Sequence, residues 1–179
     1  MTPEPTAEII ARALRIKLLC LDVDGVMTDG RIVFDSDGAE SKFFHVQDGS
    51  GIRYAQRAGL TVAFVTGRES PVVGRRAEEL GVSLLYQKVK QKLPVVEELL
   101  SRLGLTFEET LCMGDDLPDF PVMRRAGLAV APANAVQEIK EVAHLVTDRS
   151  GGHGAVREMI DWLLKTNGTW QGIMERYLK

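Results

Sequence analysis

Two aspartates stand at the end of an apolar run near the start of the chain. Residues 17–30 read KLLCLDVDGVMTDG, in which the apolar residues 18–21 precede Asp22 and Asp24. Such a run predicts a short buried strand, and a carboxylate buried at its end is costly unless something pairs with it. A bound cation is a natural partner, and Asp22 could also attack a phosphoryl group. Taken alone, the pair also fits a strand that ends in a solvated acidic turn.

Polar residues follow two further apolar runs. The segment 60–68 reads LTVAFVTGR, and the segment 110–116 reads TLCMGDD. Taken singly, these residues have structural alternatives, because Thr66 could cap a helix and the paired acids could form a capping turn. Lys92 could likewise be a solvated charge, since two other lysines closely precede it.

The segments between these motifs predict the elements that would position them. Apolar residues recur at helical spacing in some segments and form short runs in others. The Asp-Gly pair at 37–38 is a turn signal and predicts a β-hairpin at 31–46, with strands at 31–34 and 42–46. Asp48 would cap the next helix, which continues to Arg57. Further helices are predicted at 6–14, 72–80, 93–103, around 122–123, at 136–142 and through 156–163, and further strands at 18–21, 60–65, 82–86, 110–113, 128–130 and 145–146.

Strands that alternate with helices predict an α/β fold, a doubly wound parallel sheet with helices on both faces. We expect one domain over residues 1–179, with the hairpin protruding and a C-terminal tail at 168–179. Ligands of such sheets bind beyond the carboxyl ends of the strands. That edge would collect Asp22, Asp24, Thr66, Arg68, Asp115 and Asp116 in one crevice.

The composition is that of an ordinary globular protein, with 45% hydrophobic residues, 26% charged residues and a net charge of −3. This balance gives no basic footprint for nucleic acid, and no run has the length of a membrane helix. We therefore expect neither partner. The N-terminal residues lack the pattern of a secretory signal, and Cys20 and Cys112 lie in apolar runs. Reduced core thiols and a cytoplasmic location are therefore expected.

The residues at the predicted sheet edge could together perform phosphoryl transfer, which needs a nucleophile, a cation, fixed positive charge and a proton donor. Asp22 would attack phosphorus and form an aspartyl-phosphate. Asp24 would protonate the leaving alcohol and then activate the hydrolytic water. Asp115 would complete a Mg²⁺ site with Asp22 and the carbonyl of Asp24. Thr66 and Lys92 would hold the non-bridging phosphate oxygens.

The order of these motifs resembles that of the haloacid dehalogenase superfamily. Its four motifs are matched by DVDG at 22–25, TGR at 66–68, Lys92, and GDDLPD at 114–119. The resemblance covers nearly the whole chain and implies a Rossmann-like fold with Mg²⁺ as cofactor. It gives supporting roles to Asp116 and Asp119. An Asp at the second acidic position of the first motif implies a phosphatase or a phosphomutase.

The spacing of the motifs leaves no room for the cap domain that many members of that superfamily carry. Residues 24–66 are filled by the hairpin, one helix and one strand, and residues 66–92 by one helix and one strand. A small phosphate ester would then face an open, wet site, which weakens electrostatic catalysis. We therefore expect a neighbouring subunit to close the site. The hairpin is a candidate assembly element, because an isolated hairpin is only marginally stable.

A closer resemblance is to the family of 3-deoxy-D-manno-octulosonate 8-phosphate (KDO 8-phosphate) phosphatases. It is carried by DVDGVMTDG at 22–30, the hairpin, DGSGI at 48–52, GDDLPDFPVM at 114–123, GGHGAVRE at 151–158 and the tail with Trp170. The resemblance implies a Mg²⁺-dependent homotetramer that acts on a phosphorylated sugar acid in lipopolysaccharide biosynthesis. It also implies that hairpins build the central interface and that tails fold over neighbouring sites.

Substrate contacts are also implied by this resemblance. Gly67, Arg68 and Arg76 match positions that face the substrate, and a guanidinium fork could read a sugar carboxylate. Arg76 could equally be an exposed helix charge. His45 and Gln47, on the predicted return strand, could reach the sugar, and His45 otherwise reads as a strand surface residue.

Four alternatives remain at this stage. A sialic-acid-type (nonulosonate) 9-phosphate phosphatase shares the motifs, although the long tail favours the octulosonate ester. A phosphomutase would need its aspartyl-phosphate shielded from water. A catalytically silent scaffold is disfavoured, because nothing structural requires all five of the residues Asp22, Asp24, Thr66, Lys92 and Asp115. Dinucleotide binding is disfavoured because the first strand ends in DVDG rather than a G-x-G-x-x-G turn.

Overall fold

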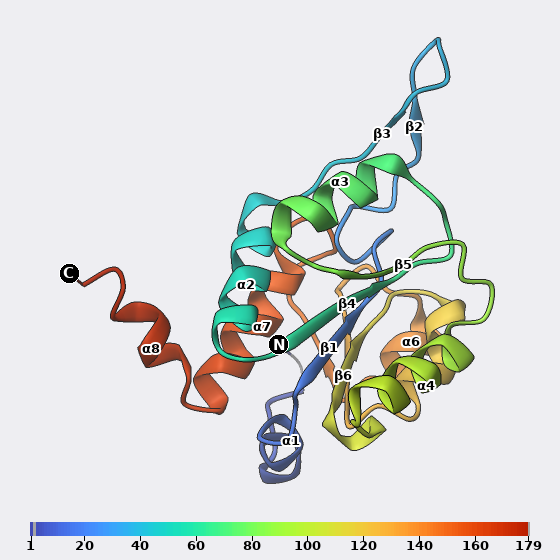
Figure 1. The fold of residues 1–179 in the computed structure, drawn as a ribbon. Coiled ribbons are helices and arrows are strands. Elements are labelled where there is room, and N and C mark those ends of the chain that lie inside the picture. Colours follow the sequence, from blue (N-terminus) through green and yellow to red (C-terminus); the bar gives the residue numbers. More distant parts are fainter. Residues whose placement is uncertain (2, 179) are drawn as a thin grey trace.

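A parallel six-stranded sheet lies between two layers of helices in the computed structural model, which describes residue 1 and residues 3–178 (Figure 1). The strand order is β5-β4-β1-β6-β7-β8, and a separate hairpin pairs β2 with β3. The predicted doubly wound α/β fold is confirmed. The strands are β1 Leu18–Leu21, β2 Val33–Phe34, β3 Glu40–Ser41, β4 Thr61–Val65, β5 Leu84–Tyr86, β6 Thr110–Met113, β7 Leu128–Ala131 and β8 Leu145–Val146. The α-helices are α1 Ala7–Ala13, α2 Val46–Arg57, α3 Pro71–Leu80, α4 Lys92–Leu103, α5 Phe120–Met123, α6 Gln137–Val142, α7 Ala155–Thr166 and α8 Trp170–Met174.

Side chains of the central strand alternate between two hydrophobic cores. Leu19 and Leu21 of β1 pack with α2, α3 and α7, whereas Leu18 and Cys20 pack with α4, α5 and α6. This alternation follows from the two-residue period of a strand. Figure 1 shows the two groups of helices on opposite faces of the sheet. Because both faces are covered, the open part of the sheet is the edge beyond its carboxyl ends.

The hairpin and the following helix differ from the sequence prediction. Paired strands are confined to β2 and β3, and the predicted return strand at 42–46 forms only one bridge, between Phe44 and Thr28. Helix α2 begins at Val46, with His45 as its N-cap, so Asp48 lies inside the first turn instead of capping it. Asp48 is buried and accepts a hydrogen bond from the backbone of Arg157. Packing of α2 on α7 therefore overrides the strand propensity of this segment.

Both cysteines are free and buried, as predicted, and they face each other in register on β1 and β6. Within residue 1 and residues 3–178, every helix is too short or too polar to cross a membrane. The tail packs on its own chain through Tyr54, whose ring lies edge-on to Trp170, and Tyr177 contacts the Tyr54 hydroxyl at 3.1 Å.

Candidate active site

The carboxyl ends of three adjacent strands meet at one cavity of about 320 Å³. Asp22 follows β1, Thr66 follows β4, and Asp115 follows β6 by two residues. The strand order β4-β1-β6 places these ends side by side at the point where the winding of the sheet reverses. The lining includes every predicted site residue except Arg76, His45 and Gln47. It consists of Asp22, Asp24, Gly30, Thr66, Gly67, Arg68, Lys92, Asp115, Asp116, Pro118 and Asp119.

Lys92 lies at the base of this cavity, at the first position of α4. Its Nζ is 2.7 Å from Oδ1 of Asp22 and 2.7 Å from Oδ1 of Asp119, and its side chain is buried. Burial lowers the pKa of Lys92, but the two carboxylates outweigh burial and hold that pKa above its ordinary value. The site therefore keeps a fixed positive charge beside Asp22, where a phosphate oxygen could be bound.

Three carboxylates lie close together beside this lysine. Ligand oxygens of Asp22, Asp115 and Asp119 lie within 4.8 Å of one another. Burial, with repulsion from Asp119, raises the pKa of Asp22 to about 7. Burial, with repulsion from Asp22 and Asp119, raises the pKa of Asp115 to about 7. Buried acids held this close favour either shared protons or a bound cation.

The oxygens of this cluster fit Mg²⁺ unequally. Oδ1 of Asp115 is buried and has no hydrogen-bond partner in the described part of the chain, whereas Asp119 accepts from Lys92 and from the backbone N–H groups of Asp115 and Asp116. A Cβ at Gly25 would lie 2.0 Å from Oδ2 of Asp115, so only glycine admits that carboxylate. Asp115 and Asp22 are therefore the side chains with oxygen ligands available to a hard cation.

The predicted phosphate and sugar contacts lie partly inside and partly outside this cavity. Thr66 is buried at the cavity wall, and Arg68 stands at its mouth, 42% exposed. Arg76, on α3, pairs with Glu79 at 2.8 Å and lies outside the cavity. His45 caps α2. Gln47 accepts from Arg149 at 3.3 Å and lines a separate cavity of about 600 Å³.

Comparison with known proteins gives consistent matches. A model of the haloacid dehalogenase-like hydrolases matches residues 83–160. The chain is 45% identical over 163 residues to 3-deoxy-D-manno-octulosonate 8-phosphate phosphatase KdsC of Escherichia coli K12, covering 91% of this chain and 87% of that protein. A probable YrbI family phosphatase from Pseudomonas syringae superposes with a TM-score of 0.94 at 42% identity, covering 97% and 99% of the two chains. The chain belongs to the KDO 8-phosphate phosphatase family.

A family member from Moraxella catarrhalis has been solved in complex with magnesium, phosphate and KDO. It superposes on this chain with a TM-score of 0.93 at 38% identity, covering 95% of this chain and 98% of that one. Membership of this family makes the chain a phosphoric monoester hydrolase of the haloacid dehalogenase-like class. The expected family and enzyme class are thus confirmed.

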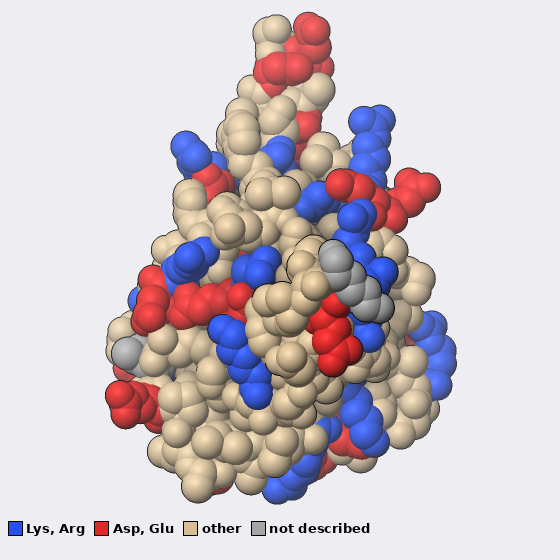
Figure 2. Space-filling model, turned by 90° about the vertical axis from the view of Figure 1, so that its left-hand side faces the viewer, with Lys and Arg blue, Asp and Glu red and all other residues tan. Residues whose placement is uncertain are grey.

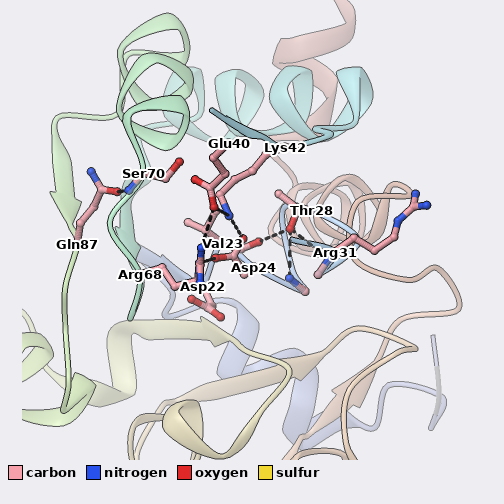
Figure 3. A network of polar contacts seen from close by, with 12 residues as sticks. Asp22, Val23, Asp24, Thr28, Arg31, Glu40, Lys42, Arg68, Ser70 and Gln87 are labelled. Atoms are coloured by element: carbon pink, nitrogen blue, oxygen red, sulfur yellow. Dashed lines mark hydrogen bonds and ion pairs between the residues drawn. The ribbon is translucent and has the colours of Figure 1, made fainter. Parts of the chain in front are cut away.

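The structure adds residues around the site that were not predicted. Lys42 and Glu40, from the hairpin, reach Asp24 and Arg68 (Figure 3). Their spacing of two residues, which puts both side chains on one side of an extended segment, was the available signal. Asn134 donates to the Gly25 carbonyl at 2.9 Å and accepts from the Gly151 N–H at 2.6 Å. Nothing in the local sequence around Asn134 indicated this bridge.

Proposed function

We propose that the chain hydrolyses KDO 8-phosphate to the free sugar acid and phosphate, with Mg²⁺ as cofactor, in lipopolysaccharide biosynthesis. The observation that carries the proposal is the cavity in which Asp22, paired with Lys92, lies beside Asp24 and Asp115. This cavity occurs in a chain 45% identical to an enzyme of that name. The magnesium, phosphate and KDO bound to the Moraxella catarrhalis protein support the same substrate and cofactor.

The proposed reaction has two steps. A carboxylate oxygen of Asp22 attacks phosphorus, and the ester P–O bond breaks as Asp24 gives a proton to the leaving sugar oxygen. Asp24 then takes a proton from water, whose oxygen attacks phosphorus and displaces the Asp22 carboxylate as inorganic phosphate forms. Lys92 and Thr66 hold the non-bridging oxygens in both steps.

Mg²⁺ would be held by Asp22, Asp115 and the backbone carbonyl of Asp24. When bound, it would neutralise negative charge on the carboxylates and the phosphoryl group. Asp119 would support the site by holding Lys92, and Asp116 by capping the turn that carries Asp119, since its Oδ1 accepts from Leu117 N–H at 2.8 Å.

Recognition of the sugar acid is assigned to the rim of the cavity. Gly67 and Arg68 would meet the substrate at the mouth. Arg76 lies outside the cavity, so its proposed contact would have to be made in the site of another subunit. In line with the family resemblance, the proposal includes a homotetramer. A cytoplasmic location is also proposed, in line with the free, buried Cys20 and Cys112.

Phosphate release from a panel of esters tests this proposal. The panel contains KDO 8-phosphate, a nonulosonate 9-phosphate and common hexose phosphates, each with Mg²⁺. We expect strong preference for KDO 8-phosphate, abolished by Asp22→Asn and retained by Asp148→Asn, an exposed acid away from the cavity. Preference for the nonulosonate ester would keep the mechanism and replace the substrate. Full turnover in Asp22→Asn would refute the covalent mechanism.

A further inference from the structure

Lys42 is a buried charge directly behind the first motif. Its side chain is 1% exposed, and its Nζ lies 2.5 Å from Oδ1 of Asp24 and 3.4 Å from Oε1 of Glu40. Figure 3 shows Lys42 and Glu40 extending from the hairpin arm toward the loop that carries Asp24. A lysine buried this deeply must be paired with an acid. Of its two acidic partners, Asp24 lines the cavity and Glu40 contacts Arg68, which also lines it.

Arg68 contacts the same two acids, Glu40 and Asp24. It donates to Oε1 of Glu40 at 2.9 Å, and its Nε lies 3.8 Å from Oδ2 of Asp24. Two cations and two carboxylates thus form a charge-balanced network across β1, β3 and β4. Replacing buried ion pairs by apolar side chains often costs no stability, so stability alone gives little reason for this network.

The two oxygens of Asp24 have different surroundings. Oδ1 is held by Lys42, whereas Oδ2 is buried and accepts no hydrogen bond among the described residues. Asp24 and Arg68 line the cavity, but Lys42 does not. Lys42 therefore contacts Asp24 from outside the substrate space, and a bound ester would touch the carboxylate rather than the lysine.

We propose that Lys42 is a positioning residue for Asp24, fixing its carboxylate through Oδ1 so that Oδ2 exchanges the proton with the reacting oxygens. This inference rests on the proposed function, in which Asp24 is the general acid and base. It gives the hairpin a second role besides assembly, because Lys42 follows β3 directly. Glu40 would hold the lysine in place, and Arg68 would in turn hold Glu40.

Two esters with different leaving groups separate this role from a structural one. A sugar alcohol needs a proton to leave, whereas the phenolate of p-nitrophenyl phosphate leaves without one. The ratio kcat/KM reports the step in which the ester bond breaks. For Lys42→Met we expect kcat/KM on KDO 8-phosphate to fall by about 100-fold, the scale of a misplaced catalytic group. On the aryl ester it should change little.

Three variants serve as controls. Lys42→Arg should recover part of the lost rate on the sugar ester, since it keeps the charge. Lys90→Met removes an exposed lysine and should leave both rates unchanged. In an Asp24→Asn background, Lys42→Met should add no further loss, because coupled residues are not additive. A thermal melt establishes that each variant is folded.

If Lys42→Met lost the same factor in kcat/KM on both esters, the positioning role would be overturned. A raised KM for the sugar ester with kcat unchanged would overturn it as well. Additive losses in the double variant would also overturn it. If the wild-type chain releases no Asp22-dependent phosphate from either ester, the proposed function fails, and this inference fails with it. An active wild type with equal losses in Lys42→Met refutes the inference alone.

Discussion

At the scale of single residues, the site is defined by acids so close together that their negative charges need a neighbouring cation or bound protons. Lys92 neutralises part of that charge, since its Nζ contacts both Asp22 and Asp119 at 2.7 Å. Oδ1 of Asp115 receives no such contact from any residue that the structure describes. The cluster therefore leaves oxygens of Asp115 and Asp22 that a divalent cation could bind, and protons should compete with that cation for the site.

This competition predicts how Mg²⁺ and pH act on stability. The pKa values of Asp22 and Asp115 rise from 3.8 to about 7 on folding. Groups with a raised folded pKa stabilise the fold fully below their unfolded pKa, and that stability is lost as pH rises through the folded pKa. The Mg²⁺-free chain should therefore lose stability between about pH 4 and about pH 8. Mg²⁺ replaces the protons, and its stabilisation should grow over the same range.

Thermal melts with and without Mg²⁺ across this pH range measure the effect. At the upper end, Mg²⁺ at about 100 times its Kd should add about 2.7 kcal/mol. Asp115→Asn should remove most of the Mg²⁺ gain and flatten the pH dependence of the metal-free chain. A Mg²⁺ gain of the same size at low and high pH would contradict the assignment of these two acids.

At the scale of elements, the loop after β1 is held by the glycine-rich segment before α7. A Cβ at Gly151 would lie 1.8 Å from the carbonyl oxygen of Gly25, and Asn134 bridges the same two loops. A side chain at Gly151 would therefore displace the Gly25 backbone and, with it, the loop that carries Asp24. The GGHG segment thus acts as a packing surface for the first motif rather than as a phosphate-binding turn.

Gly151→Ala should therefore damage activity through the loop. We expect the displaced first motif to lose about 100-fold in turnover, and the overpacked contact to cost about 1–3 kcal/mol of unfolding free energy. Gly74→Ala, on α3, is the matched control, because its Cβ would meet no atom of residue 1 or residues 3–178 within 4 Å. That variant should keep full activity and gain up to about 1 kcal/mol. Normal turnover in a folded Gly151→Ala chain would show that the two loops are not coupled.

Elements were predictable from the sequence where local pattern and burial agree. The strand ends that carry Asp22, Thr66 and Asp115 were predictable, because buried apolar runs stop where polar residues begin. The start of α2 was not, since its packing on α7 and the burial of Asp48 depend on contacts distant in sequence. The reach of Lys42 to Asp24 depends likewise on how the hairpin folds back, which no local pattern encodes.

At the scale of the whole molecule, apolar side chains are exposed on and next to the hairpin. Ile32, Phe34, Phe43 and Val46 are each more than half exposed. On the face drawn in Figure 2, mostly uncharged side chains lie below the acidic tip of the hairpin, above a body where basic and acidic side chains are interspersed. Fully burying one such side chain contributes about 1.5–3 kcal/mol, so these residues together could hold subunits in contact.

The hairpin surface predicts the effect of two substitutions on assembly and catalysis. The wild-type chain should sediment as a tetramer, and the Phe34→Ser/Val46→Ser double variant should dissociate. If a neighbouring subunit closes the site, the dissociated variant should lose kcat/KM on KDO 8-phosphate, because its cavity stays open to water. Leu14→Ser, an equally exposed apolar residue at the end of α1, should change neither property. A wild-type monomer with full activity on this small ester would refute closure by a neighbour, and the cavity of one chain would then suffice for the chemistry.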